Sequence, residues 1–259
     1  MSNPTMPAVF IGHGNPMNTL EHNRFTESWV AFAAQAPTPR AILAISAHWY
    51  INATAVTAME HPKTIHDFYG FPPELFAVEY PAPGDRALAE NVAAVVDPTW
   101  VGMDTDSWGL DHGTWSVLAH MYPSADIPVV QLSLDATKSL DEHVALGAAL
   151  APLRNDGVMI VASGNVVHNL GMVQWNSPDS GFDWALDFDA AAKVIMTEHP
   201  GDLAQLRAHP AYKLAVPTPD HFLPLAYLAG LASAAEATCD VLVEGPQMGS
   251  LTMTSYSIH

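Results

Sequence analysis

The sequence predicts an α/β fold: one domain, residues 1–259, in which a central mixed, mostly parallel sheet is flanked by helices. Apolar runs of strand length recur along the chain with little polar alternation, as expected of strands buried on both faces. Amphipathic helical patterns alternate with these runs, which is typical of sheets built from strand–helix–strand units. No internal repeat and no linker rich in Gly or Ser divides the chain, and 259 residues suffice for one large core.

The N-terminal half contains the first strands and helices of this fold. Apolar runs predict strands at 8–13, 41–48 and 53–59. Amphipathic patterns predict helices over 20–35 and 85–96. The segment 60–83 is rich in Pro and aromatic residues, so we expect a long loop there.

The C-terminal half continues the alternation of helices and strands. Helices are expected at 115–121, at 140–150, over most of 183–208, and within 220–230. Strands are expected at 127–134 and 157–164. The chain closes with two apolar runs, 239–245 and 250–258, which we expect to pair as antiparallel strands. That pair and the extra strand at 53–59 make the predicted sheet mixed.

The composition excludes several classes of partner. The formal net charge is −18, with 9 basic against 27 acidic residues. Binding of nucleic acids or of anionic membranes needs a basic surface, so neither is expected. The same charge opposes long-range capture of anionic substrates, so an anion would need a local binding group.

Cysteine usage and the terminal sequence indicate a cytoplasmic protein. The one cysteine, Cys239, cannot form an internal disulfide, and its apolar neighbours favour a buried, inert thiol. The first residues, MSNPTMPAVF, lack the basic and long apolar regions of a signal peptide. The most apolar long stretch, 221–235, is too short to span a bilayer.

Histidine is unusually frequent, with 13 residues against 9 basic ones, and five histidines stand at informative positions. His13, His48 and His168 follow predicted strands, and ligands of open α/β sheets bind beyond the carboxyl ends of strands. His221 precedes a predicted helix, and His112 stands in the glycine-containing segment GLDHGTW. We therefore expect these five histidines to share one metal site.

The chemistry of imidazole narrows the choice of metal. Imidazole nitrogens suit Zn, Fe, Cu and Ni, and a single cysteine excludes a thiolate cage. Asp111 and Asp220 adjoin candidate histidines and are candidates for orienting them. An aromatic wall or lid is the second expectation, although ordinary loop packing explains the same residues: Tyr50, His66, Phe68, Tyr69 and Phe71.

Several segments in order resemble one known family. They are FIGHGNPM, AISAHW, TIHDFYGFP, GLDHGTWSVL, DIPVVQLSLD, VASGNVVHNL, PTPDHFLPL and MGSLTM. Together they span about residues 8 to 257 and resemble the bacterial 4,5-DOPA extradiol dioxygenases, members of the class III extradiol ring-cleaving superfamily.

The resemblance implies roles for individual residues. It implies that His13, His48 and His221 bind the metal and that His112 is the acid–base residue. His168 would be a fourth ligand or a catalytic group on the substrate side. The expected substrate contacts, Tyr50, His66 and Tyr69, come instead from the aromatic wall or lid described above. Most ring-cleaving members of the superfamily use two His and one carboxylate, so a third His is a departure.

The resemblance also implies an activity. The expected reaction is extradiol cleavage of a catechol ring by O2, of the 4,5-DOPA dioxygenase type, with one divalent metal. Fe(II) would support ring cleavage, whereas three neutral His also form the donor set with which zinc activates water. Two alternatives follow: a zinc-dependent hydrolase on the same three-His site, or a non-catalytic protein of this fold that binds a metal or ligand. No motif contains a basic residue that would anchor the carboxylate of DOPA, which allows simpler catechols.

Overall fold

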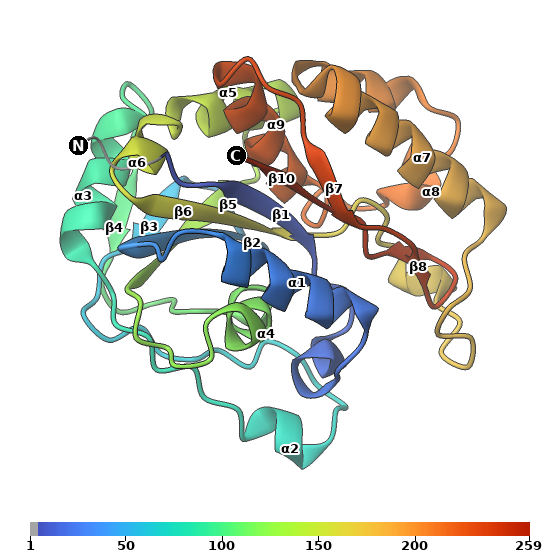
Figure 1. Cartoon of the computed structure of the whole chain (residues 1–259), viewed down its shortest axis with the longest axis horizontal. Coiled ribbons are helices and arrows are strands. Elements are labelled where there is room, and N and C mark those ends of the chain that lie inside the picture. Colours follow the sequence, from blue (N-terminus) through green and yellow to red (C-terminus); the bar gives the residue numbers. More distant parts are fainter. Residues whose placement is uncertain (1–4) are drawn as a thin grey trace.

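An eight-stranded sheet forms the centre of the computed structural model, which describes residues 5–259 (Figure 1). Residues 1–4 of the predicted domain lie outside the described residues. In spatial order the strands are β4 (Gly102–Asp104), β3 (Ala55–Thr57), β5 (Val129–Asp135), β2 (Ala41–Ile51), β6 (Val158–Gly164), β1 (Ala8–Gly12), β10 (Ser255–Ile258) and β7 (Asp240–Val243). A separate two-stranded sheet pairs β8 (Pro246–Gln247) with β9 (Leu251–Thr252).

The sheet is mixed, with a parallel centre, as predicted. Strands β5, β2, β6 and β1 run parallel to one another, and β10 is antiparallel to both β1 and β7. The register pairs Gly12 at the end of β1 with Gly164 at the end of β6. The carboxyl ends of these central strands therefore open at one edge of the sheet, where α/β proteins bind ligands.

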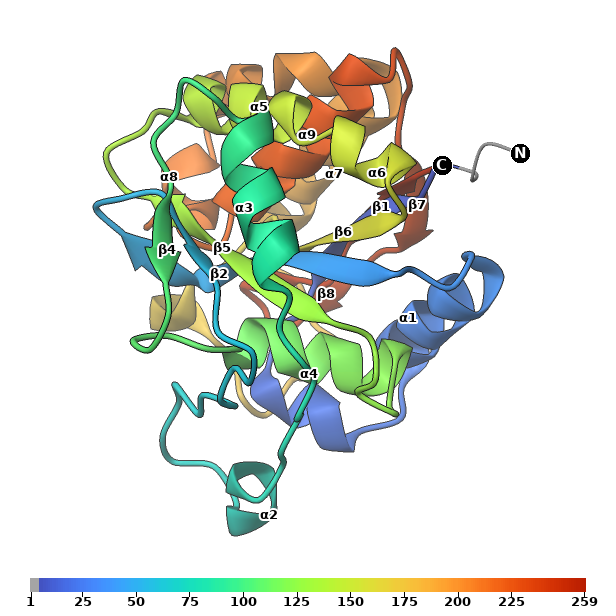
Figure 2. The ribbon, with the colours of Figure 1, turned by 90° about the vertical axis from the view of Figure 1, so that its left-hand side faces the viewer.

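Helices cover both faces of the sheet (Figures 1 and 2). The α-helices are α1 (Arg24–Gln35), α2 (Pro73–Phe76), α3 (Arg86–Val95), α4 (His112–Met121), α5 (Leu140–Ala149), α6 (Pro152–Asn155), α7 (Asp183–Glu198), α8 (Tyr212–Ala215) and α9 (Leu223–Ala234). The 3-10 helices are η1 (Pro16–Leu20), η2 (Leu170–Met172) and η3 (Pro200–Ala208). Helices α1 and α4 lie on one side, and α3, α5, α7 and α9 lie on the other.

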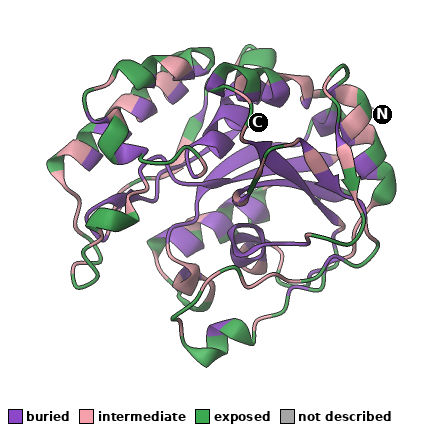
Figure 3. Ribbon diagram, turned by 180° about the vertical axis from the view of Figure 1, so that it is seen from behind, coloured by how far each residue is buried: buried purple, intermediate pink, exposed green. Residues whose placement is uncertain are grey.

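Alternation along the strands divides the core between these two layers. In β1, Val9 and Ile11 pack toward α1 and α4, whereas Ala8 and Phe10 pack toward α5 and α9. Both sets are fully buried, and buried residues dominate the centre of the sheet in Figure 3. Burial on both faces explains why β1 and β6 are continuously apolar or small instead of alternating.

Three predicted element boundaries are wrong, each for a local reason. Helix α1 begins at Arg24 instead of residue 20, because Asn23 caps it and the preceding residues form η1. Helix α4 begins at His112 instead of residue 115, because Asp111 accepts a hydrogen bond from Thr114 N. Strand β2 continues past His48 to Ile51, because pairing with β5 resumes at Tyr50 after a register shift.

Two loops contain elements that the sequence did not indicate. The segment 60–83 includes the short helix α2, and β4 extends the edge of the sheet beside β3. The final antiparallel pair is confirmed as β7 and β10, although β8 and β9 interrupt it. Across residues 5–259, the apolar helices are all too short to traverse a lipid bilayer.

Candidate metal centre

The carboxyl ends of β1 and β6 hold the first part of the site. His13 directly follows β1, and its backbone N–H donates to the Gly164 carbonyl at 3.0 Å. A Cβ atom on Gly164 would lie 2.2 Å from the His221 carbonyl oxygen, so only glycine lets the segment before α9 approach. The Asn165 N–H donates to that same carbonyl at 2.8 Å. His221 is thereby fixed beside His13.

Strand β2 and helix α4 supply the second part. His48 lies two residues beyond Ser46, the last residue of β2 that pairs with β6. It therefore stands past the carboxyl end of that pairing. A Cβ atom on Gly113 would lie 2.8 Å from the His48 ring, so this glycine lets the start of α4 pack against His48. His112, the first residue of α4, therefore lies next to His48, with ring centroids 3.9 Å apart.

The structure brings all five candidate histidines together. The ring centroids of His13, His48 and His221 form a nearly equilateral triangle with sides of 5.2, 5.3 and 5.0 Å. His112 lies less evenly, 3.9 Å from His48 and 5.9 Å from His13. His168 stacks on His221, with centroids 3.5 Å apart and an interplanar angle of 3°. Each ring is largely or wholly buried.

Hydrogen bonds at Nδ1 determine where the lone pairs of these rings point. The Ser163 hydroxyl donates to the Gly113 carbonyl at 2.5 Å, so its oxygen accepts the Nδ1–H of His13 at 2.8 Å. The Nδ1 of His48 lies 3.0 Å from an oxygen of Asp67 and donates to that carboxylate. In both rings the proton is therefore on Nδ1, and the lone pair is on Nε2.

The two Nε2 atoms of His13 and His48 face each other at 3.3 Å. A separation of 3.3 Å lets the two Nε2 atoms share either a proton or a metal cation. Two nitrogen ligands bound tetrahedrally at zinc-like distances lie about 3.4 Å apart, so the separation fits a bound ion. The Nδ1 of His221 bonds to Asp220 at 2.5 Å, which leaves a third Nε2 free. The donor set thus fits one divalent metal.

Among the described residues, the three histidines whose ligand nitrogens lie close together are not the set that contains His221. One nitrogen each from His13, His48 and His112 lie within 4.8 Å of one another, which makes His112 an alternative third ligand to His221. The triangle with His221 is defined by ring centroids and not by ligand nitrogens, so His221 as the third ligand stays a prediction. Asp111 does not hydrogen-bond to a histidine side chain, because its carboxylate caps α4 and contacts Trp108 and Gln131.

Asp67 is the functional residue that sequence reasoning missed. One of its oxygens accepts from His112 Nδ1 at 2.9 Å and from His112 N at 3.0 Å, and the other accepts from His48 Nδ1. It stands in TIHDFYGFP, directly after His66, so a carboxylate inside that motif was the available signal. Its separation from His112 by 45 residues hid the contact.

Burial and mutual contact set the charges of these groups. Burial and the surrounding histidines hold the pKa values of His13 and His221 well below the ordinary value. Burial lowers the pKa of His168 to about 4. Burial and nearby His48 lower the pKa of His112, and Asp67 opposes them only in part.

Unlike the other four histidines, His48 has a raised pKa, and its partner Asp67 is the cause. Burial alone would lower the pKa of His48, but the hydrogen bond to Asp67 and the nearby carboxylates raise it above the ordinary value. Burial alone would raise the pKa of Asp67, but the hydrogen bonds from His112 and His48 hold it well below the usual range. Asp67 is therefore an anion that both imidazoles stabilise.

The five histidines line a cavity of about 650 Å³, here called the histidine cavity. Its lining also includes Asn15, residues 67–71, Leu170, Trp175, Met248 and Leu251. Of the three predicted substrate contacts, Tyr69 lines this cavity. His66 instead donates from Nε2 to the Val78 carbonyl oxygen at 2.8 Å and packs against Trp115, and Tyr50 lies near the end of β2. The latter two are not among the lining residues.

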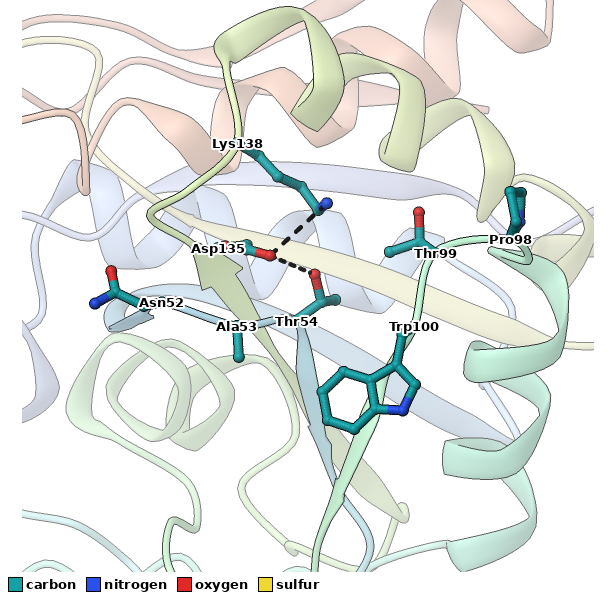
Figure 4. Close-up of a pocket in the computed structure, with 8 residues that line it drawn as sticks. All are labelled: Asn52, Ala53, Thr54, Pro98, Thr99, Trp100, Asp135 and Lys138. Atoms are coloured by element: carbon teal, nitrogen blue, oxygen red, sulfur yellow. Dashed lines mark hydrogen bonds and ion pairs between the residues drawn. The ribbon is translucent and has the colours of Figure 1, made fainter.

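A second cavity, of about 490 Å³, lies where β2, β5 and the segment after α3 meet (Figure 4). Its charged residues, Asp135 and Lys138, face each other at 3.8 Å, and Thr54 also donates to Asp135 at 2.9 Å. We call it the Asp135–Lys138 cavity. Its two charged groups already pair with each other, and its lining among the described residues contains no histidine.

The fold and the donor set define an α/β protein with a buried histidine site for one divalent metal. The family model described as the catalytic LigB subunit of aromatic ring-opening dioxygenase matches residues 6–251, and the chain belongs to this family. It is therefore an extradiol ring-cleaving dioxygenase, an oxidoreductase, which favours this function over the hydrolase and the non-catalytic alternatives.

Individual relatives agree with the family match. A 4,5-DOPA dioxygenase extradiol of Escherichia coli K12 is 47% identical over 264 residues, covering 100% of this chain and 96% of the relative. One from Beta vulgaris is 38% identical over 233 residues, covering 86% and 85%. The crystal structure of an uncharacterized E. coli K12 protein aligns with a TM-score of 0.85 and 43% identity, covering 98% of this chain and all of that one.

Proposed function

We propose that the protein cleaves the ring of a catechol with O2, using one divalent metal, Fe(II), held by His13, His48 and His221. In this reaction the carbon–carbon bond beside the hydroxyl pair breaks, and both oxygen atoms enter the semialdehyde product. The observation that carries the proposal is the pair of facing Nε2 atoms, 3.3 Å apart, next to the hydrogen-bonded pair of His112 and Asp67.

When bound, Fe(II) supplies the redox chemistry and the binding positions for a catechol and O2. The chain itself supplies the proton chemistry. His112 Nδ1–H donates to Asp67, so its Nε2 carries the lone pair and can accept a proton from a catechol hydroxyl. Asp67 then stabilises the imidazolium, as a carboxylate does for a general base, and the same ring can return the proton to the product.

Hydrogen bonds from neighbouring side chains keep the histidines in this geometry. Asp67 fixes His48 and His112 together, Asp220 fixes His221, and Ser163 fixes His13. His168 stacks on His221 and lines the cavity, which supports a role on the substrate side. The burial of the imidazoles restricts access of water to the reacting groups, which strengthens their electrostatic interactions.

Zinc is the metal that a second candidate function would use. Three neutral imidazoles form the donor set with which zinc activates water, so a hydrolase reaction on the same site has a specific basis. The cytoplasmic location stays a prediction, supported by the single buried thiol of Cys239.

Oxygen uptake tests the proposal. Apoprotein prepared without air is loaded with Fe(II) or Zn(II) and supplied with catechol, L-DOPA and protocatechuate, while product absorbance is followed beside an oxygen electrode. We expect uptake matched to a yellow ring-cleaved product with Fe(II) only. No uptake with any catechol, together with tight Zn(II) binding, would favour the hydrolase instead.

A further inference from the structure

The lining of the histidine cavity contains few groups that can hold a polar substituent of a substrate. In the part of the chain that the structure describes, neither Lys nor Arg belongs to it. Its carboxylate, Asp67, is already held by His48 and His112. Besides the histidines, the lining side chains that can donate a hydrogen bond are those of Asn15, Tyr69 and Trp175. A substituent therefore meets neutral donors here instead of a cation.

Asn15 differs from the other two donors because its side chain is fixed in place. Its Oδ1 accepts a hydrogen bond from the Met17 N–H at 2.9 Å. A backbone N–H can only donate, so the amide oxygen faces Met17 and the NH2 group is the other end of the amide. That NH2 group makes no hydrogen bond to any described residue. Tyr69 is 92% exposed and Trp175 is 63% exposed, so water competes for their donors.

The backbone around Asn15 is also held. The Asn15 N–H donates to Gln247 Oε1 at 3.3 Å, and the Gly14 N–H donates to Asn165 Oδ1 at 3.3 Å. Gly14 has a φ of +62°, and a Cβ atom there would collide with the sulfur of Met253, so this turn packs closely. The amide of Asn15 is therefore ordered before a ligand binds, which lowers the entropy lost on binding.

Asn15 lies close to the proposed reaction site. It stands two residues beyond His13, so their Cα atoms are at most roughly 7 Å apart. In the proposed reaction the two catechol oxygens lie at the metal and at His112, and the ring substituent is several bonds away from them. A donor displaced from His13 in this way suits the substituent better than the reacting oxygens.

An anionic substituent needs such a donor. The chain's net charge of −18 opposes capture of anions, although salt screens that field beyond about 8 Å. A carboxylate that loses water on entering a cavity must gain a hydrogen bond, because an unpaired buried charge is unfavourable. An N–H that donates to a carboxylate makes a charge-assisted hydrogen bond, which is roughly twice as strong as one between neutral groups.

We propose that Asn15 determines substrate specificity, because its side-chain NH2 group donates to a carboxylate on the ring substituent of the catechol. The inference rests on the proposed ring-cleaving function and specifies its substrate class: catechols whose side chain has a carboxylate, of which L-DOPA is one. Asn15 stands in the segment FIGHGNPM, so the anchor of the carboxylate is a neutral amide inside a motif that contains no basic residue.

A matched pair of ligands tests the carboxylate. One is 3-(3,4-dihydroxyphenyl)propanoate, and the other is 3-(3,4-dihydroxyphenyl)propanamide, which has the same shape with NH2 in place of one oxygen. Calorimetric titration into the Zn(II)-loaded protein measures binding without turnover, and oxygen uptake by the Fe(II)-loaded protein measures kcat/KM. We expect the unaltered protein to bind the propanoate at least about threefold more tightly, because its acceptor is charged.

Asn15→Asp tests the residue. The new side chain keeps an oxygen for the Met17 N–H and replaces the NH2 donor with an acceptor. It should repel the propanoate and accept from the propanamide, so the ratio of propanoate to propanamide should fall at least about tenfold in both affinity and kcat/KM. Asn52→Asp adds the same charge at an exposed residue that lines the Asp135–Lys138 cavity, and it should leave both ratios within about twofold.

A second variant covers a failure of the first to fold. Asn15→Ser keeps a side-chain oxygen that suits the same capping position and removes the amide NH2 group. We expect the propanoate to lose its threefold advantage over the propanamide in this variant.

The outcomes separate the two proposals. Unchanged ratios in both Asn15 variants overturn the role of Asn15, and tighter binding of the propanamide by the unaltered protein overturns the preference for a carboxylate. Either result leaves ring cleavage intact. If the Fe(II) protein cleaves no catechol while the titrations with Zn(II) show the expected shift, the proposed function fails and the role of Asn15 in binding is supported.

Discussion

The histidine cavity and the Asp135–Lys138 cavity differ in how much bonding capacity they leave unused. In the first, Nδ1 of both His13 and His48 is hydrogen-bonded, and their Nε2 atoms face each other at 3.3 Å. In the second, the carboxylate of Asp135 bonds to Thr54, Thr137 and Lys138 (Figure 4). The contrast shows what indicates a reactive site. Ligand nitrogens that converge and have no other partner indicate it, whereas cavity size and charge do not.

The largest expected effect comes from removing the imidazole of a predicted metal ligand. His221→Ala should abolish stoichiometric metal binding and lower kcat/KM at least about a thousandfold, because a bound ion supplies several kcal/mol of transition-state stabilisation. His112→Ala should retain the metal and lower kcat by about 10²–10⁴, the usual contribution of a general acid–base residue. Elemental analysis and oxygen uptake measure the two properties. If His112→Ala loses the metal and His221→Ala retains it, the two roles are exchanged.

A smaller effect is expected from the residue that orients two rings. Asp67→Asn keeps the shape but removes the anion that accepts from both His48 and His112. Loss of such an orienting contact costs about 10–100-fold in metal affinity or activity. Asp220→Asn, which acts on His221 alone, is the matched comparison. Competition titration with a chelator measures affinity, and an unchanged affinity and kcat in Asp67→Asn would contradict the role.

Asp189 extends the comparison. One of its carboxylate oxygens is buried without a hydrogen-bond partner among the described residues, but Asp189 lines neither of the two cavities. Its Oδ2 accepts from Thr254 at 2.6 Å, while Oδ1 is buried with no partner in the described chain. Burial raises its pKa from 3.8 to about 6. A raised folded-state pKa means that the stabilising contribution is complete below about pH 4 and is lost as the pH rises through 6.

Asp189→Asn should therefore stabilise the protein at pH 8 and have little effect at pH 4. Two pKa units correspond to about 2–3 kcal/mol of unfolding free energy at most. Denaturant unfolding at a series of pH values measures this difference. An identical pH dependence in both proteins would show that Asp189 does not carry it.

The smallest effect is expected in the Asp135–Lys138 cavity. Lys138→Met removes a partly exposed ion pair of 3.8 Å, which contributes about 0–1 kcal/mol. We expect kcat/KM to stay within about twofold and the unfolding free energy to fall by less than about 1 kcal/mol. A large loss of activity would give this cavity a role in the reaction and remove the contrast with the histidine cavity.

Sequence patterns predicted the layers better than the boundaries. Apolar runs such as 157–164 are long, unbroken and flanked by helices, so burial on both faces was readable from composition alone. The end of β2 was not readable, because His48 and Tyr50 interrupt the apolar run although pairing with β5 resumes at Tyr50. The start of α4 depends on a cap by Asp111, a local contact that periodicity does not reveal.

By itself, the sequence determined the fold class, the resemblance to the extradiol dioxygenases and the histidines that meet at one edge of the sheet. These properties follow from local hydrophobic patterns and from the rule that parallel strands end at a common edge. Only the tertiary structure revealed Asp67 as the shared partner of His48 and His112, and the facing nitrogens of His13 and His48. Their contacts join residues that are tens of residues apart, and such distances depend on the packing of the whole chain.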